Sequence, residues 1–443
     1  MKIKSKASFW IYYKLKNKGK FWKILNEQIK AQHYPIGKLE EIQFNKLRRL
    51  IEHTYSNVQL YRDMMEAASV KPSDIKNTGD IEKLPIITKT ELREGFPDKV
   101  IAQNLPKSRF ILDKTSGTIN QPLEFYKDKN DELNESCARF RWLINAGYKL
   151  GEKRILIKGE KPKDSNVDSR YSRLKFISAF GMNEKEFDKW FDFLVKFKPT
   201  TIESFPSPLV SFSNYLKKNN KKLNVPIIIT LGEMLTKENR KLIEERFNGK
   251  IYDSYGCSEA MYIAQECDTH NGLHYDMCRF LVEFVNNNDK GVKEELEGDV
   301  LITNLDNYVM PIIRYKVGDM AILSSKKCVC GSNFPKIKEI KGRIVDQLKS
   351  PSGKILDLPY FATIFEDEVR YVRHFQIIQK GKRYLLIKIV FNSKKEENKQ
   401  VISRIKKKIT DYVDKGMKIE ISPVDEIPLG RTGKRIFIKS EVK

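Results

Sequence analysis

The feature that most constrains the fold is a regular alternation of amphipathic helices and short apolar strands between residues 184 and 255. The pattern predicts three helices and two strands, at 184–197, 208–218, 237–247, 201–204 and 227–230. Strands that alternate with helices in this way are typical of a parallel sheet covered by helices. Because ligands of such sheets bind at the carboxyl ends of the strands, the loops after Thr230 and Tyr252 are the predicted places for a site.

The predicted secondary structure follows other patterns on both sides of this region. Upstream we predict helical spacing over 36–70, a helix that starts at Thr88 with Glu91 completing a capping box, and further elements at 110–112, 130–146 and 154–157. Downstream we predict strands at 281–285, 300–303 and 320–323, then a hairpin over 371–391, a basic helix and a strand at 418–421. The predicted fold class is α/β, with a large layered N-terminal domain of mixed sheets over 1–342 and a small α+β lid domain over 343–443.

The net charge of +24 needs an explanation. Nucleic acid, an anionic membrane and a small polyanion would all be attracted to such a chain, although its lysines are spread widely and do not require a partner. Residues 1–35 form a basic segment with aromatic residues at Phe9, Trp10, Tyr12, Tyr13, Phe21 and Trp22. This segment suits either a membrane surface or, as we favour, packing against the following domain. We expect a cytoplasmic protein, with peripheral membrane contact as the alternative, and no specific nucleic-acid partner.

The stretch from Thr115 to Pro122 has the composition of an anion-binding loop. Gly117 lets backbone N–H groups turn inward, and the hydroxyls of Thr115, Ser116 and Thr118 can donate hydrogen bonds to phosphate oxygens. A polar turn between two strands is the other interpretation of the same residues.

Four later stretches carry groups that a phosphate site uses. Gly232 and Glu233 follow one strand, and Tyr255, Gly256 and Glu259 follow the next. Asp319 lies at a turn, and Lys434 lies on a glycine-flanked loop of the small domain. Together they provide an aromatic platform, a carboxylate for Mg²⁺, an acceptor for ribose hydroxyls and a mobile lysine, which are the parts of an ATP site.

On these residues the sequence resembles the acyl-adenylate-forming superfamily, and within it the phenylacetate-coenzyme A ligase-like family that includes members from capsular-polysaccharide clusters. The matching segments run in family order from about Leu84 to Lys434. The resemblance implies that Thr115, Ser116, Gly117 and Thr118 grip phosphates and that Glu259 holds Mg²⁺. It also implies an adenine slot and ribose and catalytic contacts, made by Gly232, Glu233, Tyr255, Gly256, Asp319, Arg343 and Lys434.

The sequence departs from the family pattern at two places. Asn120 and Gln121 stand where the loop commonly has a glycine and a lysine, so we considered Lys114 or Lys127 as a substitute for the missing charge. Val345 stands at the hinge position that is commonly aspartate, and Asp346 follows it.

The cysteines form a second group of candidate site residues. Six cysteines without a secretory signal argue against a disulfide framework. Cys267, His270 and His274 lie in one short stretch, and Cys328 and Cys330 lie in another. The resemblance implies a structural Zn²⁺ site made of Cys267, His274, Cys328 and Cys330, and ordinary buried thiols remain the alternative.

The predicted activity is ATP-dependent conversion of a carboxylic acid to an acyl-AMP, followed by transfer, in this family most often to coenzyme A. The alternatives are amide formation with an amino sugar or amino acid in surface-polysaccharide synthesis, and adenylyl transfer. From another class, the alternative is a non-catalytic protein that binds nucleic acid or a membrane. The sequence specifies neither the acid nor the oligomeric state, although we expect the acid beside Trp142, Phe205–Pro208, Met261 and Tyr262.

Overall fold

A computed structural model describes most of the chain. The described residues are 19–114, 123–158, 173–179, 184–286, 288–324, 326–343, 348–352, 355–356, 361, 364–365, 368, 371–393, 397–428 and 436–442. The chain divides into two compact units, Met1–Val317 with Ala321–Ile340, and Gly318–Met320 with Lys341–Lys443. The fold is α/β, as predicted, and the predicted roles of 1–342 as a binding domain and of 343–443 as a mobile lid stay predictions.

The first unit opens with helices that pack on its core. They are α2 (Lys20–Ala31), α3 (Ile36–Asn57), α4 (Gln59–Ala67) and α5 (Lys89–Gly95). The predicted capping box at α5 is confirmed, since the Thr88 N–H donates to Glu91 over 2.6 Å. The apolar face of α2 is not offered to a membrane, because Phe21 and Leu25 are buried and pack against α6 (Lys129–Asn145). Phe9, Trp10, Tyr12 and Tyr13 lie outside the described residues.

A mixed sheet of eleven strands runs through the described part of the first unit, in the order β10-β11-β12-β13-β9-β8-β7-β6-β5-β3-β4. Its strands are β3 (Arg154–Lys158), β4 (Leu174–Ser178), β5 (Thr201–Ser204), β6 (Ile227–Leu231), β7 (Lys250–Tyr255), β8 (Ala264–Glu266), β9 (Leu273–Tyr275), β10 (Phe280–Val285), β11 (Glu297–Asn304), β12 (Tyr315–Ser324) and β13 (Lys336–Arg343). The run β4-β3-β5-β6-β7 is parallel, whereas β7-β8, β8-β9, β9-β13 and β10-β11 pair antiparallel.

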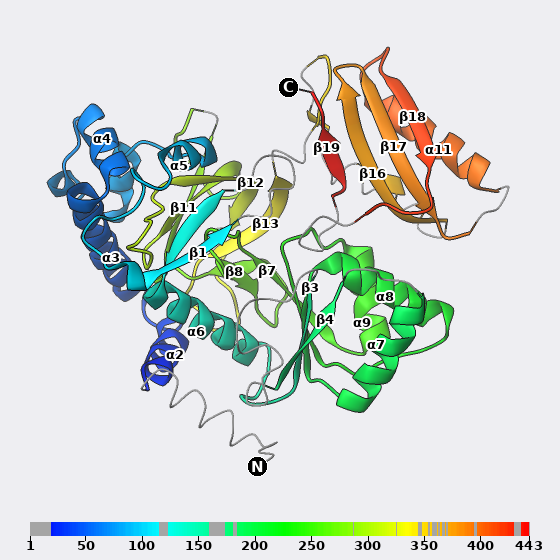
Figure 1. Ribbon diagram of the computed structural model, residues 1–443, viewed down its shortest axis with the longest axis horizontal. Coiled ribbons are helices and arrows are strands. Elements are labelled where there is room, and N and C mark those ends of the chain that lie inside the picture. The colour runs from blue at the N-terminus through cyan, green and yellow to red at the C-terminus, as the bar shows by residue number, and fades with distance from the viewer. Residues whose placement is uncertain are drawn as a thin grey trace. The chain divides into compact units, whose positions relative to one another are not determined.

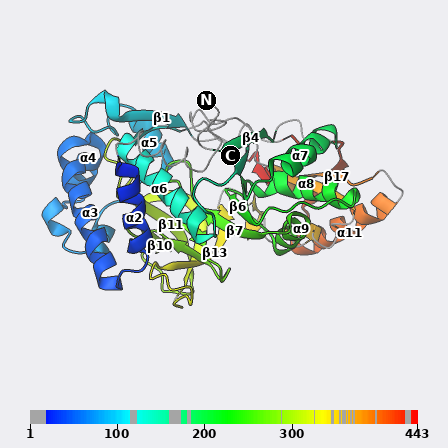
Figure 2. The same ribbon diagram turned by 90° about the horizontal axis from the view of Figure 1, so that it is seen from below.

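Helices cover both faces of the parallel strands. On one face lie α7 (Glu184–Phe197), α8 (Pro206–Lys218) and α9 (Lys237–Phe247) (Figure 1). They bury Ile155, Ile157, Ile202, Ile228 and Ile251 of the strands. On the other face α6 and α2 lie side by side (Figure 2), where the rings of Phe21 and Phe140 meet at 5.4 Å. Strands buried on both faces explain why these runs are almost continuously apolar.

A two-stranded ladder precedes α6. Strands β1 (Phe110–Lys114) and β2 (Glu124–Asp128) pair antiparallel, with Lys114 opposite Glu124. In the sequence these strands stand on either side of residues 115–122, which lie outside the described residues.

The second unit has its own core. Its four-stranded sheet has the order β18-β17-β16-β19, formed by β16 (Val372–Gly381), β17 (Tyr384–Phe391), β18 (Lys418–Pro423) and β19 (Ile438–Ser440). Helix α11 (Glu397–Tyr412) buries Val401, Ile405 and Ile409, and a short pair joins β14 (Leu348–Lys349) to β15 (Ile355–Leu356). The predicted hairpin around Gly381 is therefore confirmed. No helix among the described residues is long and apolar enough to cross a membrane.

Candidate active site

Two predicted segments lie together at the carboxyl edge of the parallel strands. Strands β6 and β7 pair in register, with Leu231 opposite Ser254. Gly232, which follows β6, has a φ of 75°, a conformation that glycine adopts without strain. The structure therefore brings Gly232 beside Tyr255 and Gly256 at the ends of two neighbouring strands, as the sequence predicts.

Glu233 has a structural partner that the sequence did not suggest. Its carboxylate accepts hydrogen bonds from the backbone N–H and the hydroxyl of Ser207, at 2.9 and 3.0 Å. Ser207 lies in the first turn of α8, where backbone N–H groups lack partners within the helix. The carboxylate of Glu233 thus binds the start of α8, and its predicted part in an adenine slot remains a prediction.

The residues Tyr255–Ile263 form a tight turn, which we name the Glu259 turn. Cys257 and Ala260 exchange two backbone hydrogen bonds, and the Ile263 N–H donates to the Tyr255 carbonyl over 3.0 Å. A Cβ at Gly256 would approach the Tyr262 nitrogen to 3.0 Å, so a side chain at this position would crowd the turn. The sequence Tyr-Gly-Cys-Ser-Glu therefore specifies a compact turn that ends a parallel strand.

Glu259 is buried within this turn and is held from another strand. The hydroxyl of Tyr315, at the start of β12, donates a hydrogen bond of 2.9 Å to Oε1 of Glu259. Both side chains are largely removed from solvent. A buried carboxylate of fixed direction is the kind of group that binds a hard cation.

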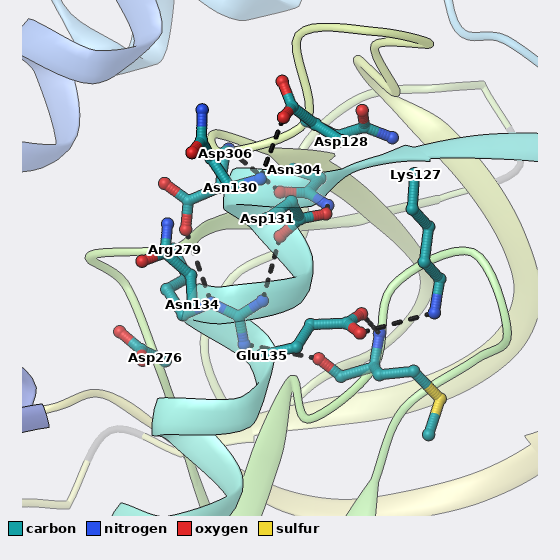
Figure 3. A network of polar contacts seen from close by, with 12 residues as sticks. Lys127, Asp128, Asn130, Asp131, Asn134, Glu135, Asp276, Arg279, Asn304 and Asp306 are labelled. Atoms are coloured by element: carbon teal, nitrogen blue, oxygen red, sulfur yellow. Dashed lines mark hydrogen bonds and ion pairs between the residues drawn. The ribbon is translucent and has the colours of Figure 1, made fainter. Parts of the chain in front are cut away.

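A network of buried and half-buried charges borders the Glu259 turn, and Figure 3 shows the part around Asp131, Glu135 and Arg279. Four carboxylates pair with four cations; they are Asp131, Glu135, Asp276 and Asp306, and Lys46, Lys127, Arg141 and Arg279. Arg279 is almost fully buried between Asp131 at 3.3 Å and Asp306 at 3.4 Å. Burial and the charge of Glu135 raise the pKa of Asp131 to about 7, against the pull of Arg279.

The network holds the Glu259 turn by its backbone. The Met261 N–H donates to Oε1 of Glu135 over 3.3 Å, and Arg279 donates to the Met261 carbonyl over 3.4 Å. Lys127 lies 3.3 Å from Glu135 and 3.4 Å from Asp113. Although burial disfavours its charge, these carboxylates raise the pKa of Lys127. Lys127 is thus committed to carboxylates, which argues against the role of phosphate-binding substitute that we considered for it.

The region expected to receive the acid is more polar than its sequence suggests. The rings of Trp142 and Tyr262 meet at 5.2 Å, as their predicted proximity requires. Close to Tyr262, however, Glu203 is buried and accepts from Arg139 over 2.6 Å and from Arg154 over 3.0 Å. Glu203 and Arg139 were missed because isolated charges in a strand and a helix resemble surface residues.

The four predicted zinc ligands converge. The ligand atoms of Cys267, His274, Cys328 and Cys330 all lie within 4.8 Å of one another. The Cys267 and Cys328 sulfurs are 3.6 Å apart, close to the spacing of about 3.8 Å that Zn–S bonds of about 2.3 Å give in a tetrahedron. Nδ1 of His274 bonds to the Phe334 carbonyl at 2.8 Å, so that Nε2 faces the sulfurs.

The thiols of this cluster differ in acidity. Although burial opposes it, hydrogen bonds involving Thr269 lower the pKa values of Cys267 and Cys328. Burial and the neighbouring thiols raise the pKa of Cys330 to about 12. Since three thiolates repel one another unless a cation lies between them, the donor set fits a structural Zn²⁺. His270, which pairs with Glu266, is outside the cluster.

Several predicted residues are not placed by the structure. Thr115, Ser116, Gly117, Thr118, Asn120, Gln121, Val345, Asp346 and Lys434 lie outside the described residues. Arg343 ends β13, and Asp319 lies in β12 after Gly318, whose φ is 87°. Both belong to the second unit, so their part in the site stays a prediction.

Sequence reasoning missed Tyr315, Glu135 and Arg279. Tyr315 stands four residues before Asp319, at the start of a strand whose apolar neighbours Ile312 and Ile313 are a signal of burial. Glu135 and Arg279 carry no such signal, because each is a single charge in an element of ordinary composition.

The chain is similar to known proteins in sequence and in fold. Residues 348–441 match the CapK C-terminal domain. The chain is 24% identical to a phenylacetate-coenzyme A ligase of Thermus thermophilus (92% of this chain, 97% of the relative) and 23% identical to Protein CapK of Staphylococcus aureus (96% and 94%). The solved structure of 2-hydroxyisobutyryl-CoA ligase with 2-HIB-AMP shares the fold, with a TM-score of 0.76 at 18% identity over 93% of this chain and 91% of that chain. Over most of its length the chain is thus similar to phenylacetate-coenzyme A ligases and to Protein CapK, and its C-terminal residues match the CapK C-terminal domain.

Proposed function

We propose that the protein is an AMP-forming acid ligase that activates a carboxylic acid with ATP and transfers the acyl group to coenzyme A. The observation that carries the proposal is the position of Glu259, buried in a tight turn at the carboxyl edge of the parallel strands and held by Tyr315. Similarity to phenylacetate-coenzyme A ligases over most of the chain supports the same activity.

The reaction has two steps. A carboxylate oxygen of the acid attacks the α-phosphorus of ATP, the bond to the β-phosphate oxygen breaks, and pyrophosphate leaves. The thiolate of coenzyme A then attacks the acyl carbon, and AMP leaves as the carbon–oxygen bond breaks. Because the first step brings an anion to an anion, the site has to supply positive charge in a place with little water.

Glu259 is the residue that we assign to Mg²⁺. Among the described residues its one hydrogen bond is to Tyr315 at Oε1, so Oε2 is left for a cation. Bound Mg²⁺ would neutralise phosphate charge during the transfer. Thr115, Ser116, Gly117 and Thr118 would bind the phosphates, and Lys434 would bind the reacting carboxylate and the α-phosphate.

The nucleoside would lie along the ends of β6 and β7. Gly232, Tyr255 and Gly256 would contact the adenine through backbone and ring, and Asp319 and Arg343 would contact the ribose. Glu233 would contribute to this slot indirectly. Its carboxylate binds Ser207 and thereby orients the first turn of α8.

We further propose a structural Zn²⁺ on Cys267, His274, Cys328 and Cys330. Four protein ligands complete a tetrahedral site and leave no position for a substrate. The metal would tie β9 and its flanking loop to the stretch before β13, and it takes no part in either chemical step.

The biological setting is proposed from the C-terminal domain. A match to the CapK C-terminal domain and similarity to Protein CapK support a role in surface-polysaccharide synthesis. Because ATP and coenzyme A are available in the cytoplasm, the enzyme would work there. The relatives favour coenzyme A over an amine as acceptor, and they do not favour a non-catalytic binding protein.

Exchange of labelled pyrophosphate into ATP tests the first step without knowledge of the acceptor. We expect exchange that depends on a carboxylic acid and on Mg²⁺, and that falls at least a hundredfold in Glu259→Gln and Lys434→Ala. A matched control is Lys338→Ala, which removes an exposed lysine bound to Glu295. Thioester formation with coenzyme A, followed by mass spectrometry, tests the second step. No exchange across a panel of aryl, aliphatic and hydroxy acids would overturn the proposal.

A further inference from the structure

We infer that Glu135 and Arg279 are positioning residues for the Mg²⁺-binding carboxylate, acting through the peptide groups of Met261. The inference rests on the proposed function for its catalytic consequence. Its structural content is that a buried charge network, and not the turn alone, determines where Glu259 points.

The first observation is that both polar groups of one residue in the Glu259 turn are bound by the network. Glu135 accepts from the Met261 N–H over 3.3 Å, and Arg279 donates to its carbonyl over 3.4 Å. Met261 lies two residues after Glu259 in the sequence. A shift of its peptide groups therefore moves the backbone that carries the carboxylate.

The second observation is that these two side chains are themselves fixed. Asp131 and Glu135 lie on the same side of α6, one turn apart, and Asp131 binds Arg279 at 3.3 Å (Figure 3). Asn304 in β11 donates to Asp131 over 3.0 Å, and Asp306 pairs with Arg279. Glu135 is held in turn by Lys127 of β2. Groups from α6, β2 and β11 thus converge on one turn.

The third observation is the conformation of the turn. Tyr262 has a φ of 59°, in the left-handed region that a tyrosine rarely adopts. Such a conformation persists only where the surroundings over-determine it. From outside the turn, the bonds to Met261, the neighbouring residue, act here together with the ring of Trp142, whose centroid lies 5.2 Å from that of Tyr262.

The test compares three variants of the full-length protein. Glu135→Met removes the acceptor for the Met261 N–H, and Glu135→Gln keeps an acceptor oxygen. Glu368→Met is the matched control, because it removes a buried carboxylate that pairs with Arg404 in the second compact unit, outside the network.

The first readout is hydrogen exchange of the peptide segment that covers the Glu259 turn. We expect at least tenfold faster exchange in Glu135→Met than in wild type or Glu368→Met, with Glu135→Gln in between. This arm needs no substrate, so it tests the positioning of the turn even if the proposed activity fails. Equal exchange in Glu135→Met and Glu368→Met would overturn the inference.

The second readout is kinetic. We expect Glu135→Met to raise the Mg²⁺ concentration for half-maximal pyrophosphate exchange, and the KM for ATP, roughly tenfold, as loss of a hydrogen bond to a charged group predicts. Glu368→Met should leave both unchanged. An active wild type with unchanged constants in Glu135→Met would refute the positioning role, whereas an inactive wild type would refute the proposed function. If Glu135→Met does not fold, Lys127→Met replaces it, since that variant frees Glu135 from its partner on β2 and the same changes are expected.

Discussion

The hydroxyl of Tyr315 binds Oε1 of Glu259 over 2.9 Å, across 56 residues of sequence. The bond joins β12 to the turn after β7 and fixes the direction of one oxygen of the carboxylate. Through this bond Tyr315 is a neutral positioning residue of the proposed site, and it takes no proton in the proposed reaction.

Removal of this hydroxyl tests its importance. In Tyr315→Phe we expect kcat/KM for ATP to fall roughly tenfold to a hundredfold, because a hydrogen bond to a charged group contributes about 1.5–3 kcal/mol. Initial rates at several Mg²⁺ concentrations measure the effect. Tyr61→Phe is a matched control, since the Tyr61 hydroxyl is also buried and binds the backbone of Pro311 and Ile313. Equal losses in both variants would mean that the effect is one of stability.

The cysteine cluster predicts a tightly bound metal. We expect the purified protein to hold about one Zn²⁺ per chain, and Cys328→Ser to lose it and to unfold at a lower temperature. Elemental analysis and thermal unfolding measure the two effects. Cys278→Ser, which alters a thiol outside the cluster, should keep the metal. Full zinc content in Cys328→Ser would contradict the assignment.

The buried network predicts that loss of an interior charge lowers the free energy of unfolding much more than loss of a surface charge. Arg279→Met leaves Asp131 and Asp306 short of a buried cation, and we expect it to lower the free energy of unfolding by about 3–5 kcal/mol. Lys338→Met breaks an exposed pair with Glu295 and should cost less than about 1 kcal/mol. Urea denaturation of both variants measures the difference, and similar small losses would show that the network does not stabilise the fold.

Asp253 predicts a pH dependence of stability. Burial raises its pKa from 3.8 to about 7, with Glu266 adding to the shift and Thr230 and Arg240 opposing it. Between these two pKa values the folded state binds a proton that the unfolded state has released. The contribution of Asp253 to the free energy of unfolding is therefore complete below about pH 4 and is lost as the pH rises to about 7. Its full size is about 4 kcal/mol, from about 1.4 kcal/mol per pH unit.

We therefore expect Asp253→Asn to flatten the fall in unfolding free energy between pH 5 and pH 8. Urea denaturation at several pH values checks this. Asp188→Asn is the control, because hydrogen bonds from Tyr215 and Lys221 lower the pKa of Asp188 and its titration lies below this range. An unchanged slope in Asp253→Asn would be inconsistent with a buried, protonated Asp253.

The sequence predicted the elements whose local pattern and tertiary environment agree. Helix α7 has the predicted bounds, Glu184–Phe197, because an acidic first turn and a regular apolar stripe define it. Strands β8 and β9 are only three residues long and carry polar residues such as Gln265 and His274. The sequence therefore shows no pattern that predicts them.

For the site, the sequence pointed to the groups that we propose as ligand contacts and missed those that hold them in place. Glu259 and the proposed zinc ligands follow recognisable spacing, and the structure brings the four side chains of the cysteine cluster together. Arg279 could not be selected among 82 lysines and arginines, because only the fold shows that it is buried. Glu233 looked like a nucleotide ligand, yet its carboxylate binds Ser207, a partner that only the crossover from β5 to β6 brings near.

Among the described residues, the groups that hold Glu259 belong to the first compact unit, since Tyr315, Glu135 and Arg279 lie before residue 318. The carboxylate that we propose for Mg²⁺ should therefore keep its position when the C-terminal domain is replaced. A chimaera that joins this first unit to the C-terminal domain of a relative should show the same slow hydrogen exchange at the Glu259 turn as the native chain.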